Sequence, residues 1–142
     1  MKILFYDTQT YDKESFSKET GNYPGVEMDF LKSTLAPQTA PLAQGYDAVC
    51  AFVNSDVGTG TVGVRLILMR CAGFNNVDLE LAGKYGMEVR RVPGYSPEAV
   101  AEHAMALALT VNRRMHKAYT KVRENDFSLG GLMGINFHGK TA

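Results

Sequence analysis

Short apolar runs recur through the first 92 residues of the chain, and they constrain its fold more than any other feature. The runs lie at 2–6, 25–31, 46–54, 64–70 and 87–92. Their length and their content of β-branched and aromatic residues are typical of β-strands. The run 46–54 is apolar throughout its centre, which predicts a strand buried on both faces. Polar or helix-like segments separate the runs, and this alternation predicts an α/β fold with a mostly parallel sheet of about five strands.

Three segments carry helix signals. Residues 10–21 are polar and end at a glycine, and residues 77–86 combine Asp78 near their start with a glycine stop. The strongest signal begins at Ser96, a good N-cap residue that is followed directly by proline. Apolar residues then recur at helical spacing without an intervening glycine or proline. This pattern predicts one long helix from 97 to about 123, with a basic end that suits the helix dipole.

Charge and composition argue against several classes of function. Fifteen basic and fifteen acidic residues give a formal net charge of zero, so we expect no nucleic-acid partner and no attraction to an acidic membrane surface. No apolar run approaches the roughly 20 residues of a membrane span, and residues 1–7 resemble a strand rather than a signal peptide. The two cysteines, Cys50 and Cys71, lie in apolar surroundings, which predicts free thiols and a cytoplasmic location. The length of 142 residues is typical of one domain.

A glycine motif raises the question of a nucleotide site. Gly58, Gly60 and Gly63 have the G-x-G-x-x-G spacing of a dinucleotide-binding turn, and Asp78 lies twenty residues after the first of them. Such a turn must lead into a helix whose N-terminus faces the pyrophosphate. Residues 64–70 have the character of a strand instead. We therefore expect a glycine-rich loop, and we keep a small nucleotide-binding protein as the alternative.

The same region is short for a parallel sheet. If the strands 46–54 and 64–70 are parallel neighbours, their connection should contain a dozen or more residues and usually a helix. Only residues 55–63 are available. Either the two strands pair differently, or a helix has been lost here.

The sequence from residue 64 onward resembles a known family. The most specific matches are RCAGFNNVDL at 70–79 and VPGYSPEAVAEHA at 92–104. They are similar to the NAD-dependent D-2-hydroxyacid dehydrogenases, most closely to their D-lactate dehydrogenase members. The resemblance implies a flavodoxin-like sheet, NAD as cofactor, a small 2-oxo or 2-hydroxy acid as substrate, and the reduction of pyruvate to D-lactate.

The resemblance also implies roles for five residues. Ala72 and Gly73 match the loop whose backbone N–H groups hold the substrate carboxylate, which agrees with the ability of adjacent amides to bind anions. Tyr95 and Phe52 match aromatic residues that border the substrate, and Val100 matches a position that faces the cofactor. Each has a structural alternative: a plain strand-to-helix loop for Ala72 and Gly73, core packing for the two aromatics, and the apolar face of the helix for Val100.

Two departures from the family affect what this chain can do. Residues 55–63 stand where the family has a helix, and the sequence stops at Ala142, where the family continues into its Rossmann glycine turn. The resemblance therefore assigns 1–95 to a substrate-binding domain, and 96–142 to a linking helix with the start of a cofactor domain whose remainder is absent. The family's catalytic arginine, acid and histidine have no counterpart here, so we expect no catalytic residue and no activity of the chain alone.

The sequence also allows a function other than that of a dehydrogenase. One alternative is a non-catalytic flavodoxin-like module that binds small carboxylates or forms a homodimer through its long helix. His103, on that helix, and Cys71 lack the partners that catalysis needs. The three histidines have no metal-ligand spacing, so we expect no metal site. Asn76 and Asp78 have the character of turn and cap residues.

Overall fold

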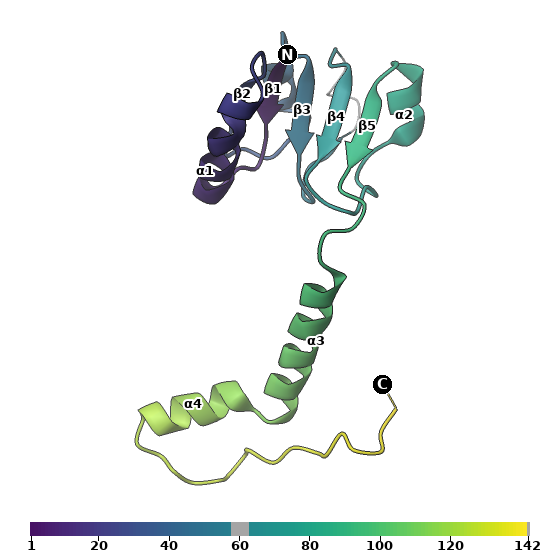
Figure 1. The fold of residues 1–142 in the computed structure, drawn as a ribbon. Coiled ribbons are helices and arrows are strands. Elements are labelled where there is room, and N and C mark those ends of the chain that lie inside the picture. The colour runs from purple at the N-terminus through teal and green to yellow at the C-terminus, as the bar shows by residue number, and fades with distance from the viewer. Residues whose placement is uncertain (58–62, 142) are drawn as a thin grey trace. The chain divides into compact units, whose positions relative to one another are not determined.

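The first part of the chain forms a five-stranded parallel sheet. The computed structural model describes residues 1–57 and 63–141, in two compact units, Met1–Tyr95 and Ser96–Ala142 (Figure 1). The strands are β1 (Lys2–Phe5), β2 (Glu27–Phe30), β3 (Ala48–Ala51), β4 (Leu66–Met69) and β5 (Glu88–Arg91). Their order is β2-β1-β3-β4-β5, and every neighbouring pair is parallel. The predicted α/β fold with about five parallel strands is confirmed.

Helical segments cover both faces of this sheet. In unit 1 they are α1 (Thr10–Glu19), η1 (Thr20–Asn22), η2 (Ala40–Ala43) and α2 (Leu79–Lys84). From β1 the chain moves outward to β2, then returns past β1 to β3 and continues to β5 in the opposite direction. Because crossovers between parallel strands are right-handed, α1 lies on one face, and η2 and α2 lie on the other.

Alternate residues of the strands supply two hydrophobic layers. The larger layer joins Leu4, Val49 and Ile67 of the strands to Ala43 of η2 and Ala82 of α2, among others. The smaller layer lies on the other face, where Ile3, Phe5 and Cys50 belong to one cluster and Phe16 of α1 packs against it, with its ring beside that of Phe5. All four residues of β3 are buried, so the prediction that this strand is buried on both faces is confirmed.

The strands β3 and β4 are parallel neighbours despite their short connection. Ala48 pairs with Leu66 and Ala51 with Met69, so the alternative that they pair differently is wrong. The strands are shorter than the apolar runs that predicted them, and the connection therefore spans 52–65, which is long enough for a parallel crossover. Within its described parts, 52–57 and 63–65, there is no helix.

The glycine motif falls partly in this connection. Gly58 and Gly60 lie outside the described residues. Gly63 has a φ of +120°, which favours glycine. It is followed by β4 rather than by a helix, so the element that would present amide groups to a pyrophosphate is not where the motif requires it.

The second unit corrects the prediction of one continuous helix over 97–123. It contains α3 (Pro97–Asn112) and α4 (Met115–Arg123), separated by Arg114, which adopts a left-handed conformation with φ of +50°. The amide of Asn112 bonds both backbone groups of Ile135, donating to O at 2.8 Å and accepting from N at 2.9 Å. These bonds join the end of α3 to a residue 23 positions further along the chain. Helix periodicity reports only on neighbouring turns, so it did not indicate a break at Arg114.

The caps of the predicted helices behave differently. Asp78 accepts a hydrogen bond from the backbone N–H of Leu81 at 2.8 Å, so its predicted role as the cap of α2 is confirmed. Ser96 is the N-cap residue of α3, but its side chain makes no capping hydrogen bond. Among the described helices, none is long and apolar enough to cross a membrane.

Candidate functional site

The strand order identifies the edge of the sheet where a ligand is expected. The connections leave β1 in one direction and β3 in the other, so the direction of winding reverses between these neighbouring strands. In open α/β sheets, ligands bind in the crevice beyond the carboxyl ends of the strands at this reversal. We therefore expect a ligand site at the segments that follow β1 and β3.

A cavity of about 400 Å³ opens at this edge. It is lined by residues that follow β1, β3, β4 and β5, namely Asp7, Gln9, Tyr11, Asp12, Phe52, Asn54, Arg70 and Tyr95. Two of them, Phe52 and Tyr95, are the aromatics that the family resemblance placed beside the substrate. They are 43 positions apart in sequence, and the fold brings both to one cavity.

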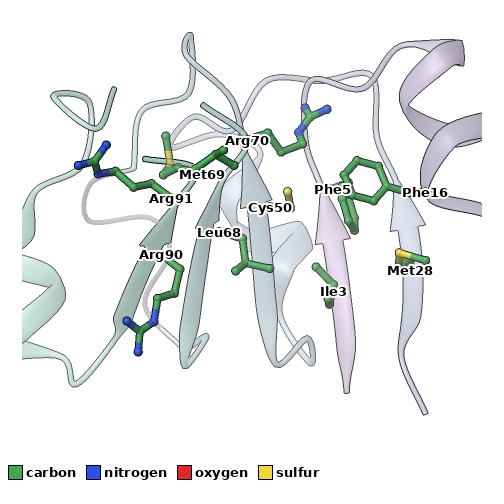
Figure 2. Close-up of a pocket in the computed structure, with 11 residues that line it drawn as sticks. Ile3, Phe5, Phe16, Met28, Cys50, Leu68, Met69, Arg70, Arg90 and Arg91 are labelled. Atoms are coloured by element: carbon green, nitrogen blue, oxygen red, sulfur yellow. The ribbon is translucent and has the colours of Figure 1, made fainter. Parts of the chain in front are cut away.

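Arg70 connects three of the elements at this edge. It follows β4, and its Nη2 atom donates to the backbone oxygens of Tyr6 at 2.7 Å and Asp7 at 2.9 Å, just beyond β1. Its Nη1 atom lies 2.6 Å from a carboxylate oxygen of Asp12 on α1. Its guanidinium carbon stands 5.2 Å from the ring centre of Phe52. Figure 2 shows this side chain extending over the carboxyl ends of the strands toward β1.

The Arg70–Asp12 pair is largely removed from water. The two side chains retain 11% and 16% of their accessible surface. Asp12 also accepts a hydrogen bond from the backbone N–H of Gln9 at 2.9 Å, which completes a capping box at the start of α1. The Nε atom of Arg70 is buried and has no hydrogen-bond partner among the described residues. The pair is therefore a fixed part of the cavity wall.

The loop after β4 holds the predicted carboxylate-binding residues. The backbone oxygen of Ala72 accepts a hydrogen bond from Arg91 at 2.8 Å, and that of Gly73 accepts one from the Cys71 thiol at 3.1 Å. A trans peptide directs its N–H opposite to its carbonyl, so the Gly73 N–H points away from Arg91. Neither Ala72 nor Gly73 lines the 400 Å³ cavity, although Arg70, which does, begins the same loop.

Asn76 ties this loop to the one that carries Phe52. Its amide nitrogen donates to the backbone oxygen of Ser55 at 2.7 Å and to that of Phe52 at 3.3 Å. The sequence indicated a turn residue here, and the structure shows a link between the segments after β3 and β4.

Val100 belongs to the second unit rather than to the one that holds the cavity. It lies on α3, with 68% of its surface exposed. Its role toward a cofactor stays a prediction.

Several cavity residues were missed in the sequence. They are Asp7, Gln9, Tyr11, Asp12, Asn54 and Arg70. Three of them, Asp7, Asn54 and Arg70, directly follow or nearly follow the carboxyl end of a strand, and this position in a predicted parallel sheet was the available signal.

A second hollow, of about 320 Å³, lies on the face of the sheet that α1 covers and shares Arg70 with the first cavity (Figure 2). Its floor is the apolar layer that includes Phe5, Cys50 and Leu68, with Phe16 of α1 at one side. Burial raises the pKa of the Cys50 thiol to about 12. A thiol that stays protonated is a poor nucleophile, so Cys50 is not a candidate for nucleophilic catalysis. Arg70, Arg90 and Arg91 also line this hollow.

The described residues do not fit an NAD pyrophosphate at the glycine motif. Gly63 leads into β4, and no helix N-terminus is presented there. Within 1–57 and 63–141 there is also no group of three or more metal-ligating side chains. The site is therefore a cavity lined by aromatic and amide side chains, two carboxylates and one arginine.

Comparison with known proteins places this arrangement in a family. A sequence profile described as "D-isomer specific 2-hydroxyacid dehydrogenase, catalytic domain" matches residues 3–126. The chain belongs to this family. The identification of the D-2-hydroxyacid dehydrogenases from the motifs at 70–79 and 92–104 is thereby confirmed.

Individual relatives extend this result. The chain is 46% identical to the D-lactate dehydrogenase of Escherichia coli, and the match covers 100% of this chain and 45% of the relative. The apo structure of D-lactate dehydrogenase from Escherichia coli matches with a TM-score of 0.84, over 99% of this chain and 47% of the other. It is 49% identical to 2-hydroxyacid dehydrogenase homolog 1 of Schizosaccharomyces pombe, over 99% of this chain and 44% of the relative. A structure described as the pyruvate reductase of Chlamydomonas reinhardtii matches at 38% identity and a TM-score of 0.82, over 96% and 42% of the two chains. The chain thus spans less than half the length of these dehydrogenases.

Proposed function

We propose that this chain is the substrate-binding part of a cytoplasmic NAD-dependent D-lactate dehydrogenase, which reduces pyruvate to D-lactate. The observation that carries the proposal is the cavity beyond β1 and β3. Phe52 and Tyr95 both line it, together with Arg70, which begins the loop that contains Gly73. The names of the Escherichia coli and Chlamydomonas reinhardtii relatives support pyruvate and D-lactate as the substrate pair.

Each group would have a distinct part in binding. The N–H groups of Ala72 and Gly73 would receive the substrate carboxylate, because Gly73 is exposed and an added Cβ would meet no atom within 4 Å, which leaves room for an anion to approach. Phe52 and Tyr95 would enclose the side chain of the substrate and exclude water from it. NAD, in the complete enzymes of the family, supplies the hydride; no step of that transfer is assigned to the residues described here.

We further propose that residues 1–95 form the substrate-binding domain, and that 96–142 form the linking segment and the start of a cofactor domain. The division into Met1–Tyr95 and Ser96–Ala142 supports these boundaries. The chain alone would not catalyse the reaction, because Gly63 leads into β4 rather than into a phosphate-binding helix.

An assay with NADH and pyruvate tests this proposal. The purified 142-residue chain should bind a small carboxylate and show no turnover above background. Turnover that disappears in Tyr95→Phe or in Gly73→Ala would contradict the proposed lack of activity. Failure to bind D-lactate or pyruvate at any accessible concentration would contradict the proposed substrate site.

The second unit favours an additional role in self-association. Apolar side chains of α3 that are at least 47% exposed are Val100, Met105, Leu107, Leu109 and Val111. Val100, Leu107 and Val111 share one face of this helix, at spacings of seven and four residues. Exposed apolar area of this kind is typical of a surface that a partner covers, and we propose a homodimer through this face of α3. Light scattering should give a dimer mass for the natural chain and a monomer for Leu107→Glu. A monomer mass for the natural chain at high concentration would overturn the dimer.

A further inference from the structure

The cavity at the carboxyl edge has an unusual balance of charge. Its charged side chains are two carboxylates, Asp7 and Asp12, and one guanidinium, that of Arg70. The cation would be the natural anchor for a second carboxylate on a substrate. It already has a partner, however, because Asp12 lies 2.6 Å from its Nη1 atom.

The remaining donors of Arg70 are also constrained. Its Nη2 atom is committed to the carbonyls of Tyr6 and Asp7. Its Nε atom has no hydrogen-bond partner among the described residues and is buried away from the cavity's solvent. The Nη1 atom that faces Asp12 is therefore the donor that a change at Asp12 would release. With Asp12 in place, the cavity carries a net negative charge from its aspartates and arginine, which disfavours the entry of an anionic side chain.

We propose that Asp12 determines the substrate class of the site by holding Arg70, so that D-2-hydroxy acids with a small neutral side chain are accepted and those with a second carboxylate are rejected. This inference rests on the proposed function, since it assumes that the cavity receives the substrate's side chain beside Phe52 and Tyr95. Asp12 acts through Arg70 and is a positioning residue.

Two matched ligands test the role of the Arg70–Asp12 ion pair. D-lactate and D-malate differ by one carboxylate, and both are stable in solution. In Asp12→Asn the amide oxygen can still accept the Gln9 N–H, and the backbone N–H of residue 12 can still donate to the Gln9 side chain, so the capping box is kept. The Arg70 Nη1 atom loses its anionic partner and becomes free to bind the distal carboxylate of D-malate.

Amide chemical-shift titration of the 142-residue chain measures both affinities. We expect Asp12→Asn to bind D-malate about tenfold more tightly than the natural chain, as a new charge-assisted hydrogen bond would give, with D-lactate affinity changed less than about threefold. Glu14→Gln removes one negative charge from an exposed position on the same helix and should leave both affinities unchanged. Asp12→Glu keeps a carboxylate beside Arg70, so it should bind D-malate as weakly as the natural chain does.

The outcomes separate the two proposals. If D-lactate binds and Asp12→Asn gains no affinity for D-malate, the role of Asp12 is overturned while the substrate site stands. An equal gain in Glu14→Gln also overturns it, because net charge alone would then explain the result. If the natural chain binds neither acid, the proposed function itself fails. Asp12→Ser provides the same test of D-malate affinity if Asp12→Asn does not fold, as judged by circular dichroism.

Discussion

The ion pair between Arg70 and Asp12 should be an important source of stability at the carboxyl edge of the sheet. It joins the end of β4 to α1 at 2.6 Å, and both side chains are at least 84% removed from water. Breaking a fully buried pair by deleting one partner costs about 3–5 kcal/mol. Here the residual exposure and the carbonyls that still accept from Arg70 lower the expected cost.

We therefore expect Asp12→Asn to lower the free energy of unfolding by about 2 kcal/mol. Arg70→Met should cost about 3 kcal/mol, because it also leaves the backbone oxygens of Tyr6 and Asp7 without their donor. The double variant should cost no more than Arg70→Met alone, which corresponds to a coupling energy of about 2 kcal/mol.

Urea unfolding followed by circular dichroism measures these differences. A loss of 2 kcal/mol lowers the midpoint by about 1 M for a typical slope of about 2 kcal/mol per molar urea. Glu14→Gln is the matched control, with an expected change below about 0.5 kcal/mol at its exposed position. A coupling energy below about 0.5 kcal/mol would show that Arg70 and Asp12 act independently, and it would contradict a stabilising ion pair at this edge.

Three further predictions concern other parts of the chain. A Cβ added at Gly134 would collide with the backbone oxygen of Asn112 in α3. Gly134→Ala should therefore weaken the hydrogen bond from the Ile135 N–H to Asn112 and speed amide exchange at Ile135. Gly130→Ala, whose Cβ meets nothing within 4 Å, should leave that exchange unchanged, and equal exchange in the two variants would contradict the contact. Burial raises the pKa of the Cys50 thiol from 9.0 to about 12. The contribution of the protonated thiol to the free energy of unfolding is therefore fully present below pH 9. It is lost between pH 9 and pH 12, by up to about 1.4 kcal/mol per pH unit. Cys50→Ala should flatten the stability profile over that range, and an unchanged slope would argue against the shift. Gly73→Ala should leave the urea midpoint nearly unchanged, because its Cβ enters open space, yet weaken D-lactate binding severalfold; unchanged affinity would remove the loop from the site.

The sheet could be predicted from the sequence because strand signals are local. Each apolar run contains its strand, and the buried centre of 46–54 became β3 at the middle of the sheet. The cap at Asp78 was also predictable, since it depends on a residue three positions away.

Features that depend on distant residues were not predictable in the same way. The break at Arg114 accompanies hydrogen bonds between Asn112 and Ile135, and the left-handed residue is neither glycine nor asparagine. The pair of Arg70 and Asp12 joins residues 58 positions apart. Their meeting depends on the strand order, which periodicity does not specify.

The candidate site was predicted in part. The family resemblance selected Phe52 and Tyr95, which line one cavity, whereas the charged wall formed by Arg70 and Asp12 became visible only in the structure. The sequence placed Arg70 at the start of the matching motif, but its side-chain partners follow from the reversal of winding between β1 and β3.

We propose above all that the carboxyl edge of the sheet binds a small D-2-hydroxy acid. The most direct test is to map the backbone amides of the 142-residue chain whose chemical shifts change as D-lactate is added. We expect saturable changes centred on Phe52, Gly73 and Tyr95, with little change at Glu14 and Lys18, which are exposed residues of α1. Absence of change at all three, or saturable changes confined to other parts of the chain, would contradict it.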